Sequence, residues 1–190
     1  MKAFGPRKRL EQQIRVWLGR AYRPAEVHDL GATMFGGDGY GAWPCLANRL
    51  HQESVVYSVG VGFDTGFDQA LISRFGLVIH GFDPTPRVIE WLQQNPQPLG
   101  FEFHPLGLAW MDGELSFAAP TRENAVSGTV VPAAVVDQET VSVPVSRLST
   151  VMSELGHERL DVLKMDIEGA EYAVLDDMLQ SDILPDQLLV

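Results

Sequence analysis

The chain has 190 residues, 45% hydrophobic and 21% charged, which is the range of one soluble α/β domain with a sizeable buried core. No apolar stretch reaches the roughly 18 residues that span a bilayer, and no apolar run follows the basic start, so we expect a cytoplasmic protein without a membrane partner. The formal net charge of -11 argues against nucleic acid as the main partner.

The single cysteine, Cys45, has no second cysteine for an internal disulfide and no neighbouring ligands for a zinc site. We therefore expect a buried or half-buried thiol there. Basic residues are concentrated in the first 24 positions, and we interpret this segment as a solvated face rather than a binding surface.

Residues 1–53 are predicted to form an N-terminal segment ahead of the main domain. Apolar residues recur at helical spacing over 10–18, which predicts a short amphipathic helix. Glycines and large rings are mixed over 31–44, which favours a loop over a ligand. Because an aromatic face can stack on a sugar, Tyr40 and Trp43 are candidate substrate-binding residues.

Residues 54–190 alternate strand-like and helix-like segments, the pattern of a mostly parallel sheet with helices on both faces. The predicted strands lie at residues 54–61, 77–82, 101–109, 141–145, 160–167 and 187–190. The predicted helices lie at residues 67–75, 86–92, 151–155 and 170–179. A turn at Asp112 and Gly113 predicts a hairpin after the third strand. The last segment reads as an unfinished fifth core strand, which predicts a domain cut short there.

A glycine-rich turn directly follows the first predicted strand. It contains Gly60 and Gly62, and glycines at this place let the backbone approach a bound nucleotide closely. The spacing G-x-G-x-x-x-G departs from the dinucleotide fingerprint, so a purely structural turn stays open as the alternative.

An acidic residue ends the second predicted strand. Asp83 lies 21 residues after Gly62, close to the separation of roughly 20 at which such folds place the acid that binds ribose hydroxyls. A carboxylate at this position can accept two hydroxyl hydrogens. A helix cap is the alternative role for Asp83.

The strand predicted at 160–167 ends in alternating charged and apolar residues, the charged ones being Lys164, Asp166 and Glu168. If the strand persists, these three side chains share one face. Charge is costly inside a sheet unless it is paired, so we expect them to face the ligand crevice or to pair with one another and with Glu171. A structural ion-pair network is the alternative, and no metal site is predicted.

The segment D-V-L-K-M-D-I-E-G-A-E-Y-A-V-L at 161–175 resembles the hallmark of the FkbM family of methyltransferases. Two further segments resemble that family's cofactor-binding regions in the same order, V-V-Y-S-V-G-V-G-F-D-T-G-F-D at 55–68 and H-G-F-D-P-T-P at 80–86. The resemblance covers residues 54–190. It implies a Rossmann-like class I methyltransferase fold that uses S-adenosyl-L-methionine.

The resemblance implies roles for the matched residues. Gly60 and Gly62 would lie against the methionine part of the donor, and Asp83 on its ribose. The cofactor-binding set on this basis is Gly60, Val61, Gly62, Asp64, Asp83, Pro84 and Asp166. Asp166 would lie nearest the transferring methyl, and Asp166 or Glu168 could accept a proton while Lys164 orients a carboxylate or an anionic acceptor. Glu171 is added to the predicted substrate-binding residues.

Members of this family typically methylate hydroxyl oxygens of sugars or secondary metabolites, so the resemblance implies a small-molecule or glycan acceptor. Two other classes stay open. A nicotinamide-dependent oxidoreductase would share the glycine turn and the ribose acid but would not require the charged cluster after residue 163. A non-catalytic nucleotide-binding module would bind without turnover.

Overall fold

The structure is a computed structural model that describes residues 28–37, 41–118, 140–167 and 169–190. The chain divides into two compact units, Met1–Gly31 and Ala32–Val190, and the second contains the described helices and strands. The helix predicted at 10–18 and the connection at 120–139 lie outside the described residues.

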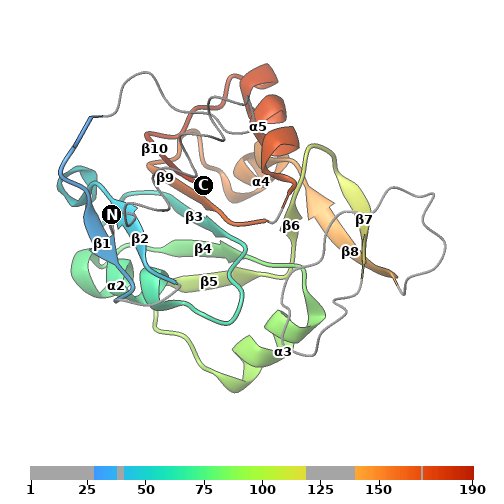
Figure 1. Ribbon diagram of the computed structural model, residues 1–190, viewed down its shortest axis with the longest axis horizontal. Coiled ribbons are helices and arrows are strands. Elements are labelled where there is room, and N and C mark those ends of the chain that lie inside the picture. The colour runs from blue at the N-terminus through green and yellow to red at the C-terminus, as the bar shows by residue number, and fades with distance from the viewer. Residues whose placement is uncertain (1–27, 38–40, 119–139, 168) are drawn as a thin grey trace, which may run out of the picture. The chain divides into compact units, whose positions relative to one another are not determined.

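Five parallel strands form the central sheet of the second unit, in the order β10-β9-β3-β4-β5 (Figure 1). In chain order they are β3 (Val56–Val59), β4 (Ile79–Phe82), β5 (Phe101–His104), β9 (Val162–Met165) and β10 (Gln187–Leu189). The strand order reverses between β3 and β9. In open α/β sheets, the carboxyl ends of the strands at such a switch point are where ligands bind.

Helices cover both faces of this sheet, and their bounds are α2 (Gly66–Phe75), α3 (Pro86–Gln94), α4 (Leu148–Leu155) and α5 (Glu171–Gln180). The glycines predicted to end α2 and α4, Gly76 and Gly156, adopt the left-handed conformation, with φ of 66° and 71°. The predicted fold class, a Rossmann-like parallel sheet between helices, is confirmed. No helix in the described part of the chain is long and apolar enough to cross a bilayer.

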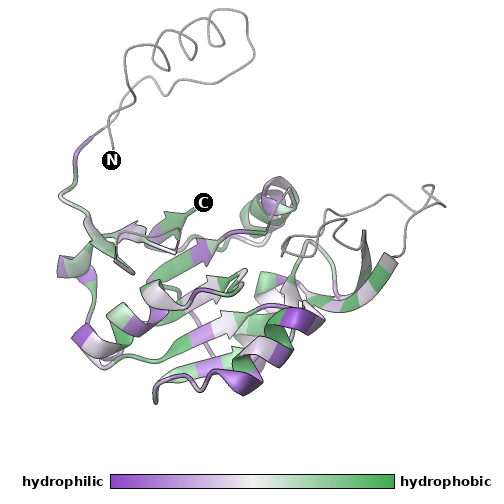
Figure 2. Cartoon of the chain, turned by 60° about the horizontal axis from the view of Figure 1, so that its bottom comes forward, coloured by the Kyte–Doolittle hydropathy of each residue, from purple (hydrophilic) through white to green (hydrophobic). Residues whose placement is uncertain are grey.

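The two faces of the sheet follow from the alternation of side chains along the strands. Val56 and Ile79 join the apolar cluster around α2, whereas Tyr57, Phe82 and Leu163 join the cluster that holds α4 and α5. Green and white predominate along the strands in Figure 2, while purple is concentrated on the helices. All residues of β3, β4 and β9 are buried, and burial on both faces fits the largely apolar sequences of these three strands.

A second, three-stranded sheet lies beside the first, with the order β6-β8-β7 and the strands β6 (Gly107–Leu108), β7 (Gly113–Ala118) and β8 (Thr140–Ser146). The single strand predicted at 101–109 is therefore wrong, because β5 and β6 belong to different sheets. Pro105 separates them and has no N–H to continue a strand ladder. The predicted hairpin is also wrong, since β7 pairs antiparallel with β8.

The segment predicted as a loop at 31–44 contains strand residues. β1 (Thr33–Phe35) pairs antiparallel with β2 (Trp43–Cys45), and a short 3-10 helix, η1 (Ala47–Arg49), follows. Cys45 is the buried thiol expected from the sequence, and burial raises its pKa to about 11. Its Sγ donates to Gln187 Oε1 at 3.2 Å, and the Leu46 N–H donates to the same oxygen at 2.7 Å, so β2 is bound to the edge strand β10.

Candidate active site

The turn after β3 is bonded to the strands on both sides of it. The Gly60 N–H donates to the Phe82 carbonyl at 2.9 Å, and the Asp166 N–H donates to the Val59 carbonyl at 3.0 Å. Gly60 has a φ of 74°, and a Cβ added to it would overlap the carbonyl oxygen of Asp166. Only glycine allows this approach, which places the turn against the segment after β9 at the switch point.

The second glycine of the turn differs from the first. Gly62 has a φ of 61°, but a Cβ added there would meet no atom within 4 Å. Its N–H donates to Asp83 Oδ2 at 3.0 Å. Gly60 is thus needed for close packing, whereas Gly62 faces open space beside an acid.

Asp83 joins the turn after β3 to the turn after β4. It is buried, and its second oxygen, Oδ1, accepts the Thr85 N–H at 2.9 Å just before α3 begins. The N-cap of α3 is Thr85 and has no side-chain cap bond, so the helix-cap alternative for Asp83 is not realised. Each carboxylate oxygen has further acceptor capacity, so Asp83 could also accept a ribose hydroxyl.

The other residues predicted around the donor have structural contacts of their own. The Val61 side chain is buried with α3, so any contact with a ligand would come from its backbone. Asp64 Oδ1 accepts the Gly66 N–H at 2.8 Å, and a Cβ added to Gly41 would overlap its carboxyl group. Pro84 lies beside Gly107 of β6. Their roles toward a cofactor stay predictions.

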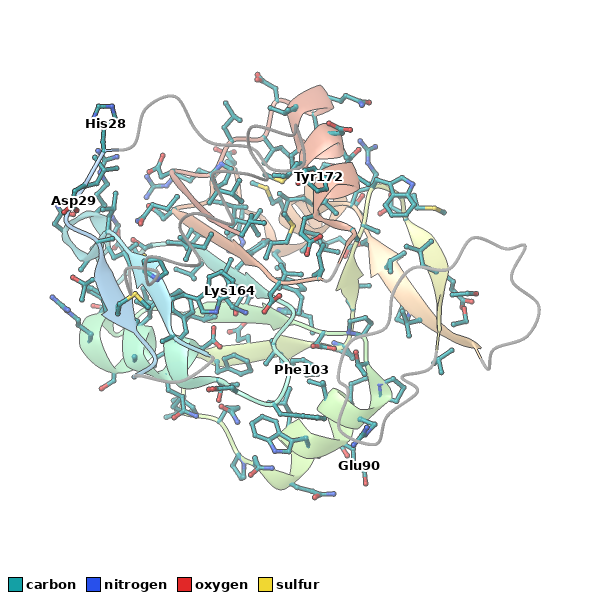
Figure 3. All side chains as sticks on the ribbon, viewed as in Figure 1. His28, Asp29, Glu90, Phe103, Lys164 and Tyr172 are labelled. Atoms are coloured by element: carbon teal, nitrogen blue, oxygen red, sulfur yellow. The ribbon has the colours of Figure 1, made fainter. Side chains whose placement is uncertain are left out.

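Lys164 is buried beneath the glycine turn, with 5% of its surface exposed. Its Nζ donates to the Gly60 carbonyl at 3.1 Å and lies 5.3 Å from the centroid of the Trp43 ring. Figure 3 shows Lys164 at the centre of the domain, separated from Tyr172 on α5. Burial lowers the pKa of Lys164, and an opposing effect comes from nearby carboxylates, those of Asp68, Asp166, Asp83 and Asp64.

A buried acid on α2, Asp68, was not predicted from the sequence. Burial raises its pKa to about 6, while Lys164 and Ser58 act in the opposite direction. Ser58 Oγ and Asp68 Oδ1 each lack a hydrogen-bond partner of acceptable geometry among the described residues, although Ser58 is near enough to favour the carboxylate. The missed signal is helical spacing, because Asp68 lies on the same buried stripe of α2 as Leu71 and Ile72.

Asp68→Asn is expected to change how stability depends on pH. Since the folded-state pKa of Asp68 is about 6 and its ordinary value is 3.8, the folded chain binds this proton more tightly, and stability falls as the pH rises through about 6. Relative to the variant, the wild type should lose about 1.4 kcal/mol of unfolding free energy between pH 5 and pH 7. Urea denaturation of both proteins at these pH values measures the difference. An unfolding free energy of the wild type that rises relative to that of the variant as the pH increases would contradict this expectation.

The segment after β9 departs from its predicted geometry. The strand predicted at 160–167 ends at Met165, so the condition for a shared strand face of Lys164 and Asp166 is not met. Asp166 is partly exposed, and its side chain accepts no hydrogen bond from the described residues. Glu171 Oε2 accepts the Gly169 N–H at 2.7 Å at the start of α5. The predicted site residues Glu168 and Tyr40 lie outside the described residues.

The sheet order and the glycine turn at its switch point place the chain in the class of Rossmann-like methyltransferase folds. Comparison with family models gives a match over residues 58–187 to the methyltransferase FkbM domain. The chain belongs to this family, which confirms the resemblance found in its sequence, and methyl transfer is the activity of the class.

Two curated relatives are similar to the chain. Probable methyltransferase-like protein 24 of Rattus norvegicus is 29% identical over 140 residues, and that of Homo sapiens is 27% identical over 140 residues. Each match covers 73% of this chain and 32% of the relative, so the chain spans about a third of the length of these relatives. No solved structure matches the chain.

Proposed function

We propose that the chain transfers a methyl group from S-adenosyl-L-methionine to a hydroxyl oxygen of a sugar or small-molecule metabolite. Methyl transfer follows from the family, and the donor and the acceptor class are the proposed parts. The bond from Gly62 N to Asp83 Oδ2 carries the proposal, because it holds a buried acid, the proposed ribose ligand, beside a glycine that faces open space.

The residues at the switch point fit a nucleoside donor. Asp83 would accept a ribose hydroxyl with its remaining lone pairs, and such a bond to a charged acceptor contributes roughly 1.5–3 kcal/mol. The absence of a side chain at Gly62 would let the donor approach the backbone. Lys164 supports this surface from beneath through the Gly60 carbonyl.

Methyl transfer requires mainly that the protein orients the donor and the acceptor. A bond forms between the acceptor oxygen and the methyl carbon, the bond from that carbon to the sulfonium sulfur breaks, and the hydroxyl proton goes to a base. The thioether leaves without needing a proton, so orientation can supply up to roughly 7–11 kcal/mol of the barrier reduction. Asp166 is the proposed base, since it is partly exposed and accepts no hydrogen bond from the described residues.

The acceptor class is supported by an aromatic ring beside this site. The ring of Trp43, on β2, lies beside the Lys164 side chain of β9. An aromatic face of this kind can stack on a sugar ring. Tyr40 and Glu171 stay candidate acceptor-binding residues. This arrangement favours a glycan or a small hydroxylated molecule.

Calorimetric titration with S-adenosylhomocysteine is the test of the donor site. We expect the wild type to bind it and Asp83→Ala to bind it at least about tenfold more weakly, because the ribose contact is lost. Asp176→Asn, an exposed acid on α5, is the control and should bind as the wild type does.

The same titration with NAD separates the donor proposal from the oxidoreductase. Binding of NAD without S-adenosylhomocysteine would overturn the proposed donor, and equal affinities of wild type and Asp83→Ala would overturn the role of Asp83. Circular dichroism of each variant checks that the turn held by Asp83 still folds. Turnover with hydroxylated acceptors excludes the non-catalytic module.

A further inference from the structure

A group of imidazole and carboxylate side chains lies on the sheet face opposite to Lys164. His80 of β4 and Glu102 of β5 are direct register partners, and His104 follows two residues later on β5. Since side chains alternate along a strand, the three share one face. One ligand atom from each lies within 4.8 Å of the others.

The separations match the coordination shell of a metal ion. His80 Nδ1 lies 3.1 Å from His104 Nε2 and 3.5 Å from Glu102 Oε2. Ligand atoms about 2.0–2.1 Å from a tetrahedral zinc ion are about 3.3 Å from one another. A small shift of the side chains would therefore place all three around one ion.

A third imidazole stands beside this group. The His157 ring, in the connection after α4, has its centroid 5.0 Å from that of His80. Its Nδ1 is hydrogen-bonded to the Tyr57 hydroxyl at 2.7 Å, which fixes the ring and leaves Nε2 available. Oriented histidines of this kind are typical of metal ligands, whose second nitrogen is held by a neighbouring group.

The protonation of the histidines is compatible with metal binding. Burial lowers the pKa of His80 to about 4, and it also lowers the pKa of His104. Imidazole binds a metal ion in its neutral form, and a lowered pKa favours that form.

We propose that His80, Glu102 and His104 form a zinc-binding site, which His157 would complete as a fourth ligand after its ring moves toward the other three. Two or three imidazoles with one carboxylate suit Zn²⁺ or a related first-row ion, whereas Mg²⁺ and Ca²⁺ prefer oxygen ligands. The ion would link the edge strand β5 to β4 and to the connection after α4, so its role is to stabilise the domain. The site does not depend on the proposed donor or acceptor.

Equilibrium dialysis of chelator-treated protein against ZnCl₂, with the metal measured by atomic emission, tests the site. We expect about one equivalent of zinc and a higher melting temperature, since a ligand that binds only the folded state stabilises it. His104→Gln and Glu102→Gln should each weaken zinc binding at least about tenfold. Substitution by Co²⁺ should give the visible absorption of a tetrahedral site.

Matched controls are His51→Gln and Glu53→Gln, an exposed histidine and an exposed glutamate close together in the chain. Both should bind zinc as the wild type does. The Glu102 side chain is 58% exposed, so its variant should fold, which circular dichroism verifies. Absence of zinc binding, or binding that both His104→Gln and Glu102→Gln retain, would overturn the proposal.

Discussion

Gly60→Ala is expected to destabilise the domain by at least about 3 kcal/mol, a large part of the roughly 5–15 kcal/mol that stabilises a typical domain. The added methyl group would overlap the backbone carbonyl of Asp166, which cannot move away as a flexible side chain could. Gly62→Ala should cost only about 1–2 kcal/mol, the strain of a left-handed alanine. Urea denaturation measures both effects.

Donor binding separates the two glycines further. The methyl group of Gly62→Ala would project into the open space beside Asp83, so this folded variant should lose affinity for S-adenosylhomocysteine. Gly76→Ala is the control, because Gly76 also has a positive φ, 66°, and open space around it but lies at the end of α2. Equal stabilities of Gly60→Ala and Gly62→Ala would contradict the packing role of Gly60.

Lys164→Met is the second substitution with a large expected effect, a loss of about 3 kcal/mol at neutral pH. It removes the hydrogen bond to the Gly60 carbonyl and leaves the buried Asp68 carboxyl without its neighbouring cation. Adding Asp68→Asn should recover part of the loss, because the amide carries no charge. A double-mutant cycle by urea denaturation measures this coupling.

Arg159→Met is the control for Lys164. The Arg159 side chain is 65% exposed and lies 3.9 Å from Asp161, so its removal should change stability by less than about 1 kcal/mol. Strictly additive effects of Lys164→Met and Asp68→Asn would show that the two buried groups do not interact.

Local sequence signals predicted the features that depend on local chemistry. Gly76 and Gly156 ended their helices as expected because only glycine enters the left-handed conformation without strain. The spacing between Gly62 and Asp83 predicted an acid beside the glycine turn, and the structure joins them by a hydrogen bond. Both signals reflect constraints that act within one turn or one βα unit.

Features that depend on tertiary packing were missed. The alternation of charged and apolar residues after Leu163 does not show that β9 ends at Met165, since the same alternation fits a strand that continues. The pairing of β7 with β8 joins segments separated by a long connection, and turn residues carry no information on such partners. The cluster of His80, Glu102 and His104 appears only when the register of β4 and β5 is known.

The bond between Leu46 and Gln187 has a consequence for biosynthesis. The two residues are 141 positions apart, and ribosomes add roughly 5–20 residues per second, so β2 emerges roughly 7–28 s before its partner β10 exists. During that interval the Cys45 thiol has no Gln187 to contact. The β1–β2 hairpin can therefore make its contacts with Gln187 only after β10 has been synthesised.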